Sequence, residues 1–267
     1  MIEFDHSRLV QKRPIDALPR ILDVPAGRCD PGPMATDNIT LDCDAILFDL
    51  DGVLVDSHPL IERILRTWAE GRGIDPDTAV AASYGRRDVD LVRAVAPTLD
   101  AEAEAALIVA CEEGDFAGIV PIPGAAGLLA VLPAACWAIV TSGTRRVATG
   151  RLRAAALPEP VYMITAEDVR EGKPAPEGYL RAAELLGVRP ERCLVVEDAA
   201  AGVLAAGAAG MRCLGIGAAL TGDVALDAWA ADLRAVDSEL VTGGHVRLNI
   251  RPNGSNRFGN LPGPSGV

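Results

Sequence analysis

Short apolar runs alternate with amphipathic stretches through the middle of the chain, and this alternation predicts strands and helices in turn. The apolar runs predict buried strands at residues 45–50, 138–141, 161–164, 194–197 and 213–216. The amphipathic stretches between the later runs predict helices at about 144–156, 176–187 and 199–209. Strands that are apolar throughout, separated by helices, are typical of a parallel sheet covered on both faces. We therefore expect an α/β fold.

Too many residues for one crossover separate the first two predicted strands, and their pattern is helical. Apolar residues form one face of a helix from Leu60 to Trp68, and further helices are expected around 89–95 and 101–113. A stiff Pro-Ile-Pro-Gly segment, 121–124, then leads into a helix at 124–131. The pattern therefore predicts an all-helical domain inserted after the first strand.

The two ends of the chain differ from this central part. Prolines and glycines interrupt residues 1–42, which we interpret as an irregular N-terminal extension, with a short helix around Ile15–Leu22 and an alternative start at Met34. Residues 241–267 are rich in Gly, Asn, Pro and Ser and are expected to be a disordered tail. These boundaries assign residues 43–56 and 122–240 to the sheet domain and residues 57–121 to the helical domain.

Composition narrows the class of protein. Hydrophobic residues make up 49% and charged residues 23%, as in a globular protein, and the net charge of −12 argues against nucleic acid as a partner. No apolar run approaches the roughly 20 residues of a membrane span, and the N-terminus lacks the apolar region of a signal peptide. The six cysteines contain no Cys-x-x-Cys pair and are expected to be free thiols. We expect a cytoplasmic monomer or weak dimer that does not bind membranes.

Candidate chemistry lies where the predicted strands end. Ligands of open parallel sheets bind at the carboxyl ends of the strands, so residues that follow successive strands are expected to share one site. Four strand ends supply carboxylates, a hydroxyl and an ammonium group, from Asp49, Asp51, Ser142, Gly143, Lys173, Glu197 and Asp198.

The pair Asp49 and Asp51 suits phosphoryl chemistry. One aspartate could attack phosphorus while the other protonates the leaving oxygen. Because both are anions, a phosphate would need an intervening cation, and Glu197 and Asp198 supply further oxygens for Mg²⁺. An EF-hand calcium loop is excluded, because Leu54 would occupy the glycine position of that loop. A plain surface turn stays open as an alternative.

Ser142, Gly143 and Lys173 are candidates for holding phosphate oxygens. A hydroxyl and backbone N–H groups ahead of a helix can bind an anion. Alternatively, Ser142 or a neighbouring threonine only caps that helix. Lys173 could be a solvated surface residue, but the chain has only one other lysine, Lys12.

Together these residues resemble the haloacid dehalogenase-like hydrolase superfamily. Its motifs match Asp49-Leu50-Asp51-Gly52-Val53, the apolar run ending at Thr141-Ser142, Lys173, and Glu197-Asp198. The resemblance implies a Rossmann-like core with an all-helical cap of the C1 type. It also implies that Asp49 forms an aspartyl-phosphate, Asp51 acts as general acid and then base, and Ser142 and Lys173 hold the phosphoryl group. Asp49, the Asp51 carbonyl and Asp198 would bind Mg²⁺, with Glu197 close by.

Flanking sequence is similar to the sugar- and polyol-phosphate phosphatases of that superfamily, which include 2-deoxyglucose-6-phosphate and glycerol-3-phosphate phosphatases. Similar stretches are Tyr84–Arg87, Ile122–Gly124, Trp137–Arg145, Ile164–Val169 and Gly172–Pro174. Arg86 and Arg87 are the expected substrate contacts of the cap, because guanidinium donors can bind hydroxyls or a carboxylate, and Arg87 is the better match to the family position. Alternatively, both lie on a solvated helix start.

Related activities differ in residues that can be checked in the sequence. Dehalogenases do not need the second aspartate, and phosphonatases need a cap lysine, yet no lysine lies between Lys12 and Lys173. β-Phosphoglucomutase carries a histidine where this chain has Ile61, and also a cap lysine. We therefore expect a Mg²⁺-dependent phosphatase acting on a small phosphorylated sugar or polyol. The alternatives are a β-phosphoglucomutase-like mutase and a non-catalytic phosphosugar-binding protein. The cap is expected to open and close about its two linkers, 56–58 and 119–123.

Overall fold

The structure, a computed structural model, describes residues 38–217, 220, 224–241 and 245–251. Its main sheet has six strands, all pairs of which are parallel. In spatial order these are β6 (Met163–Ile164), β5 (Trp137–Val140), β2 (Ala45–Phe48), β7 (Cys193–Glu197), β8 (Arg212–Ile216) and β9 (Ala228–Ala230). Every residue of the central strands β5, β2 and β7 is buried, which is why their sequences are apolar apart from Glu197 at the end of β7. The predicted α/β fold is confirmed.

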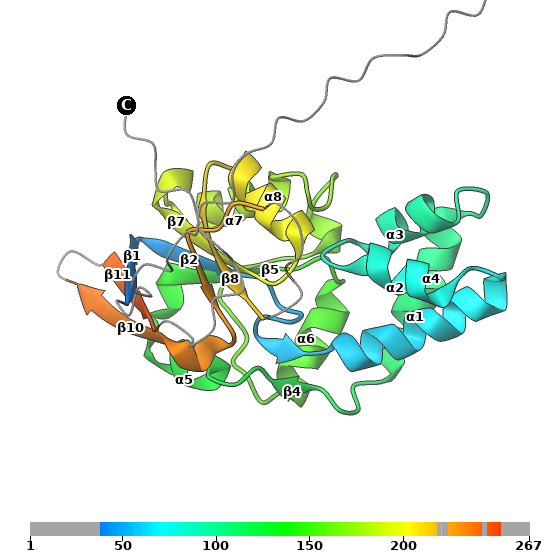
Figure 1. Ribbon diagram of the computed structural model, residues 1–267, viewed down its shortest axis with the longest axis horizontal. Coiled ribbons are helices and arrows are strands. Elements are labelled where there is room, and N and C mark those ends of the chain that lie inside the picture. The colour runs from blue at the N-terminus through cyan, green and yellow to red at the C-terminus, as the bar shows by residue number, and fades with distance from the viewer. Residues whose placement is uncertain (1–37, 218–219, 221–223, 242–244, 252–267) are drawn as a thin grey trace, which may run out of the picture. The chain divides into compact units, whose positions relative to one another are not determined.

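Helices cover both faces of this sheet, as Figure 1 shows. Ile46 and Phe48 of β2 share one core cluster with α5 (Ala125–Val131) and α6 (Arg145–Ala154). The intervening residues Ala45 and Leu47 share a second cluster with α7 (Glu177–Leu186) and α8 (Ala200–Ala208). Successive side chains of a strand point to opposite faces, so one short strand anchors helices on both sides.

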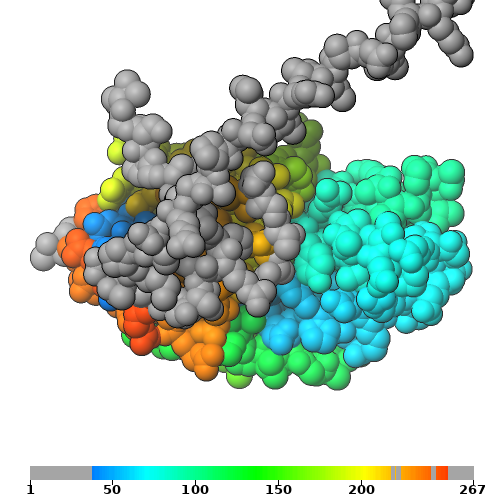
Figure 2. Space-filling view, in the orientation of Figure 1, coloured from blue at the N-terminus to red at the C-terminus, as the bar shows by residue number. Residues whose placement is uncertain are grey.

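Four helices form the insertion between β2 and β5: α1 (His58–Arg72), α2 (Pro76–Ser83), α3 (Asp88–Val95) and α4 (Ala101–Gly114). They have an apolar cluster of their own that includes Trp68, Leu91 and Ile108, and Figure 2 shows their surface in cyan. We call residues 58–114 the helical insertion. Its two connections, β3 (Val55–Asp56) and β4 (Val120–Pro121), pair antiparallel, so the chain enters and leaves side by side.

A second sheet corrects the predictions for the chain ends. Its strands are β1 (Ile39–Cys43), β11 (His245–Ile250) and β10 (Val236–Val241), and both pairs are antiparallel. The irregular extension predicted for 1–42 is therefore wrong from residue 39, and the disordered tail predicted for 241–267 is wrong for 245–250. The alternating residues Val246, Leu248 and Ile250 are buried in the main core, which stabilises this sheet.

Other expectations for the ends lie outside the described residues. These are the helix at Ile15–Leu22, the alternative start at Met34 and the tail beyond residue 251. No helix among the described residues combines the length and the apolar character needed to cross a bilayer.

Candidate active site

Asp49 lies directly after β2 and is fixed against the neighbouring strand. Its backbone N–H donates to the Val196 carbonyl of β7 at 2.9 Å. The following turn needs Gly52, whose φ is +80° and where an added Cβ would lie 2.0 Å from Asp198 Oδ2. The loop after β2 therefore packs directly against the residues that follow β7.

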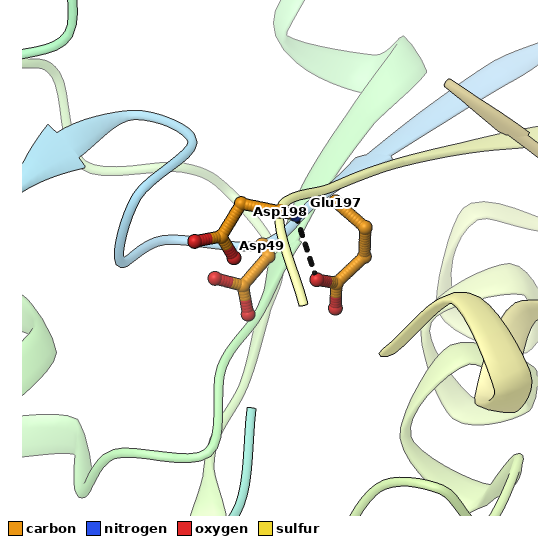
Figure 3. Close-up of side chains that lie close together, drawn as sticks. All are labelled: Asp49, Glu197 and Asp198. Atoms are coloured by element: carbon orange, nitrogen blue, oxygen red, sulfur yellow. Dashed lines mark hydrogen bonds between the residues drawn. The ribbon is translucent and has the colours of Figure 1, made fainter. Parts of the chain in front are cut away.

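Three buried carboxylates meet at this point. Oxygens of Asp49, Glu197 and Asp198 all lie within 4.8 Å of one another. In Figure 3 the Asp49 and Asp198 carboxylates are turned to the same side, while Glu197 accepts the Asp198 N–H. Burial raises the pKa of Asp49 to about 8 and raises the pKa of Asp198 well above its usual range. Crowded, buried carboxylate oxygens are a donor set that fits a hard divalent cation.

Glu197 is held by four hydrogen bonds. Its Oε1 accepts from Lys173 Nζ and from Tyr179 Oη, both at 2.6 Å. Its Oε2 accepts from the backbone N–H groups of Asp198 and Ala199, at 3.0 and 3.1 Å. A carboxylate offers about four lone-pair positions, so a cation at Glu197 would have to displace one of these donors. The described geometry thus favours Asp49 and Asp198 over Glu197 as metal ligands.

Lys173 is buried between the acidic residues, so it is not a solvated surface lysine. Its Nζ donates to Asp49 Oδ1 as well as to Glu197 Oε1. Burial acts to lower the pKa of Lys173, but the Asp49 and Glu197 carboxylates outweigh it and raise the pKa above its usual value. The ammonium group therefore stays charged beside Asp49.

Asp51 is held by two residues and lies outside the three-carboxylate cluster. Its Oδ1 accepts from Ser57 Oγ at 2.5 Å, and its Oδ2 accepts from Arg151 Nη1 at 2.8 Å. Arg151 also donates to Glu112 Oε1 at 2.6 Å. Binding of metal by the Asp51 carbonyl stays a prediction.

Sequence reasoning missed Arg151 and Glu112. Both occupy the apolar stripe of a helix: Arg151 follows the buried Val147 and Ala148 of α6, and Glu112 follows the buried Ile108 of α4. A charged residue at an apolar-stripe position was the signal that could have found them.

Ser142 and Thr144 have different roles at the end of β5. Thr144 caps α6, because its Oγ1 accepts from the Val147 N–H at 3.3 Å. Ser142 Oγ instead donates to the Gly85 carbonyl of the helical insertion at 2.9 Å. The Gly143 N–H donates to Thr141 Oγ1 at 3.1 Å. The capping alternative thus holds for Thr144, while Ser142 faces the insertion.

A pocket opens between the strand ends and the helical insertion. Five of the seven candidates in the sheet domain line it, namely Asp49, Asp51, Ser142, Gly143 and Asp198, whereas Lys173 and Glu197 do not. The insertion contributes Glu62, Tyr84, Arg86, Asp88 and Glu112. Arg86 is exposed and lines this pocket.

Arg87 lies outside that pocket. Its Nε donates to Asp90 at 2.7 Å and its Nη1 donates to the Val169 carbonyl at 3.3 Å. Of the two arginines predicted from the sequence, the structure therefore places only Arg86 at the pocket.

Comparison with known proteins gives consistent matches. A sequence model of haloacid dehalogenase-like hydrolases matches residues 43–210. Hexitol phosphatase A of Escherichia coli is 40% identical over 217 residues, which cover 79% of this chain and 97% of that protein. Glycerol-1-phosphate phosphohydrolase 1 of Saccharomyces cerevisiae is 34% identical, with 69% of this chain and 78% of that protein covered. The crystal structure of a putative haloacid dehalogenase-like hydrolase from Bacteroides fragilis has a TM-score of 0.63 at 24% identity, over 72% of this chain and 98% of that one, and thus shares the fold.

Proposed function

This chain belongs to the haloacid dehalogenase-like hydrolase family, and from that premise we propose that it is a Mg²⁺-dependent phosphatase of small phosphorylated sugars or polyols. The main observation in support of this proposal is the environment of the Asp49 carboxylate. Its carboxylate is buried, contacts Lys173, and lies beside Asp198 at the floor of a pocket that Asp51 also lines. A nucleophile, a proton-transfer group and a phosphate-binding cation are thereby gathered at one place. The names of two similar proteins, a hexitol phosphatase and a glycerol-1-phosphate phosphohydrolase, support the substrate class.

In the first proposed step, an Asp49 carboxylate oxygen attacks the phosphorus of the substrate. The bond between phosphorus and the substrate oxygen breaks, and Asp51 gives its proton to that leaving oxygen. The products are a free alcohol and a phosphoryl group covalently attached to Asp49. Asp51 lies two residues further along the same loop, and both aspartates line the pocket.

In the second proposed step, water replaces the Asp49 oxygen on phosphorus. Asp51, now a carboxylate, accepts a proton from the attacking water as the bond between phosphorus and Asp49 breaks. Inorganic phosphate leaves and Asp49 is regenerated. Asp51 therefore acts in both steps, first as acid and then as base.

Two groups of this chain, together with a bound Mg²⁺, would hold the transferred phosphoryl group. A lysine ammonium has three N–H donors, and Lys173 uses two of them on Asp49 and Glu197, which leaves one for a phosphoryl oxygen. The Ser142 hydroxyl can rotate from the Gly85 carbonyl onto a second oxygen. Mg²⁺ held by the carboxylates of Asp49 and Asp198 would offset the repulsion between these anions and the phosphate.

The helical insertion would recognise the rest of the substrate. The Arg86 guanidinium has no ion-pair partner within the described ranges, and it lines the pocket together with Glu62 and Asp88. A guanidinium donates and carboxylates accept hydrogen bonds, so this wall suits a molecule rich in hydroxyl groups. We assign the substrate contact to Arg86 rather than Arg87, which is held by Asp90.

A phosphate-release screen tests this proposal directly. Hexitol phosphates, glycerol phosphates, 2-deoxyglucose 6-phosphate and nucleotides are incubated with the full chain in Mg²⁺ and in excess chelator. We expect release from polyol or sugar phosphates with Mg²⁺, and little in chelator. A folded protein that hydrolyses none of these monoesters would refute the phosphatase assignment. Conversion of a sugar 1-phosphate into its 6-phosphate would support the mutase instead.

A further inference from the structure

Arg151 of helix α6 is buried and forms two ion pairs, one with the buried Glu112 and one with the partly buried Asp51. Its Nη1 lies 2.8 Å from Asp51 Oδ2, and its Nη2 lies 2.6 Å from Glu112 Oε1. The exposed fraction of the side chain is 2% for Arg151 and 7% for Glu112. A buried ion pair is a poor source of stability, because removing both charges from water costs about as much as their attraction returns. A role beyond stability is therefore indicated.

These two partners of Arg151 come from different parts of the fold. Asp51 belongs to the loop after β2, and Glu112 belongs to the last turns of α4 in the helical insertion. The neighbouring Gly150 allows close approach between α6 and the segment after α4, because an added Cβ there would lie 2.1 Å from Phe116 Cζ. Arg151 thus connects the proton-transfer group to the docked insertion.

We propose that Arg151 is a positioning residue that makes the placement of Asp51 depend on the docking of α4. Its Nη1 fixes one oxygen of Asp51, Ser57 fixes the other at 2.5 Å, and Glu112 fixes Arg151 itself. Each Asp51 oxygen keeps a further lone-pair position for proton transfer. The inference rests on the proposed function, since it takes Asp51 as the residue that transfers the proton.

Among the described residues, the guanidinium makes its side-chain hydrogen bonds to these two carboxylates, and the Asp88 carboxyl of α3 attracts it as well. Within the described part of the chain, the buried Nε of Arg151 has no hydrogen-bond partner. Most buried polar atoms in folded proteins have one. The side chain thus keeps its hydrogen bonds to the two carboxylates while its Nε makes none. An Arg151 side chain held in this way is suited to orienting Asp51.

A matched pair on the same two helices serves as the control. Arg146 Nε lies 3.2 Å from Glu113 Oε2, but the Arg146 side chain is 77% exposed and neither residue lines the pocket. An exposed pair of this kind contributes about 0–1 kcal/mol. The variants Arg146→Met and Glu113→Gln therefore repeat the chemical change on α6 and α4 without affecting Asp51.

The test compares two substrates whose leaving groups differ in their need for a proton. The alkoxide of a polyol phosphate must be protonated as it leaves, whereas p-nitrophenyl phosphate releases a stable anion. Because kcat/KM covers the steps up to release of the alcohol and excludes the shared water step, it reports the protonation by Asp51. For Arg151→Met and Glu112→Gln we expect kcat/KM on the polyol phosphate to fall about tenfold or more, and kcat/KM on p-nitrophenyl phosphate to fall less than about threefold. Arg146→Met and Glu113→Gln should keep wild-type values on both substrates.

Several results would overturn the proposal. Equal losses of kcat/KM on both substrates would make Arg151 a purely structural residue, and a higher KM with unchanged kcat would make it a substrate contact. Full activity of Arg151→Met on the polyol phosphate would show that Arg151 has no role in turnover. A wild-type chain that hydrolyses no monoester would instead refute the proposed function, so the two failures are distinguishable.

A double variant covers the case in which Arg151→Met does not fold because Glu112 is left buried without a partner. In Arg151→Met with Glu112→Gln, no uncompensated carboxylate remains at position 112. Because Glu112 acts through Arg151, the double variant should show the same loss on the polyol phosphate as a single variant. Losses that multiply would contradict the proposed linkage, and thermal unfolding of every variant identifies those that are folded.

Discussion

The Ser142 hydroxyl donates a hydrogen bond of 2.9 Å to the Gly85 carbonyl, so the helical insertion contacts the end of strand β5 directly. Gly85 has a φ of +70°, and a Cβ added there would lie 3.0 Å from the Ala199 Cβ and 3.3 Å from the Ala201 Cβ. The position thus needs glycine for two reasons, its backbone conformation and its close approach to the start of α8.

Gly85→Ala should therefore reduce activity more than a glycine-to-alanine change that causes only backbone strain. Gly73→Ala is the matched control, because Gly73 has a φ of +68° and no atom within 4 Å of the added Cβ. Both variants should lose about 1–2 kcal/mol of unfolding free energy from the left-handed conformation. Only Gly85→Ala should also raise KM and lower kcat for the polyol phosphate. Equal activity in the two variants would show that the approach of Gly85 to Ala199 does not matter for turnover.

Asp49→Asn should abolish phosphate release while preserving the fold. An amide oxygen is a much weaker nucleophile than a carboxylate, so turnover should fall by about a thousandfold or more. Asp42→Asn, on the exposed face of β1, provides the control and should keep full activity. The measurement is phosphate release, with circular dichroism to establish folding. Normal turnover by Asp49→Asn would refute the assignment of the nucleophile.

Lys173→Met should destabilise the protein as well as inactivate it. The substitution leaves Asp49 and Glu197 buried without their shared cation, and breaking such a buried pair costs about 3–5 kcal/mol. Urea unfolding measures the loss. Adding Glu197→Gln removes one of the unpaired charges and should restore part of the stability but none of the activity. Unchanged unfolding free energy in Lys173→Met would mean that the ion pairs are not maintained in solution.

Metal affinity should increase with pH. Burial raises the pKa of Asp49 to about 8, so below that pH protons compete with a cation for this carboxylate. From about pH 6 to about pH 8 the affinity for Mg²⁺ should rise by up to about tenfold per pH unit for each proton released. Titration calorimetry in two buffers of different ionisation heat gives both the affinity and the proton count. Affinity that is independent of pH, with no protons released, would contradict the raised pKa.

The candidate residues that could be predicted from the sequence are those whose proximity follows from the order of the strands alone. Asp49, Lys173 and Asp198 each follow a buried strand or its connecting loop, and parallel strands bring their carboxyl ends to one edge of the sheet. No knowledge of side-chain orientation was needed to group them. These three candidate residues of the sheet domain were therefore predictable from apolar runs, whereas Arg151 was not.

Contacts between helices were not predictable in the same way. Arg151 and Glu112 lie 39 residues apart, and their contact depends on how α6 and α4 are rotated about their axes. Helix α2 was also missed, because its alanine-rich sequence has no clear polar face. Only the charges on otherwise apolar stripes hinted at the Arg151 contacts.

The second sheet was missed because composition was given more weight than periodicity. Val246, Leu248 and Ile250 alternate as strand residues do, yet the glycines, asparagines and prolines after residue 251 indicated disorder. Strand β11 also pairs with β1, so Cys43 lies opposite Val246 from the far end of the sequence. Pairing over such a separation leaves no local signal in the sequence.

The antiparallel pairing of Val55–Asp56 with Val120–Pro121 has a consequence for how such proteins can diversify. The two connections leave the sheet domain at neighbouring points, so the segment between them is one contiguous insert, which we call a cassette. A cassette of different length or sequence can be exchanged there without altering the hydrogen-bonded order of the parallel strands. New substrate preferences can thus be acquired by replacing one contiguous stretch of gene, provided that the new segment keeps a partner for Arg151.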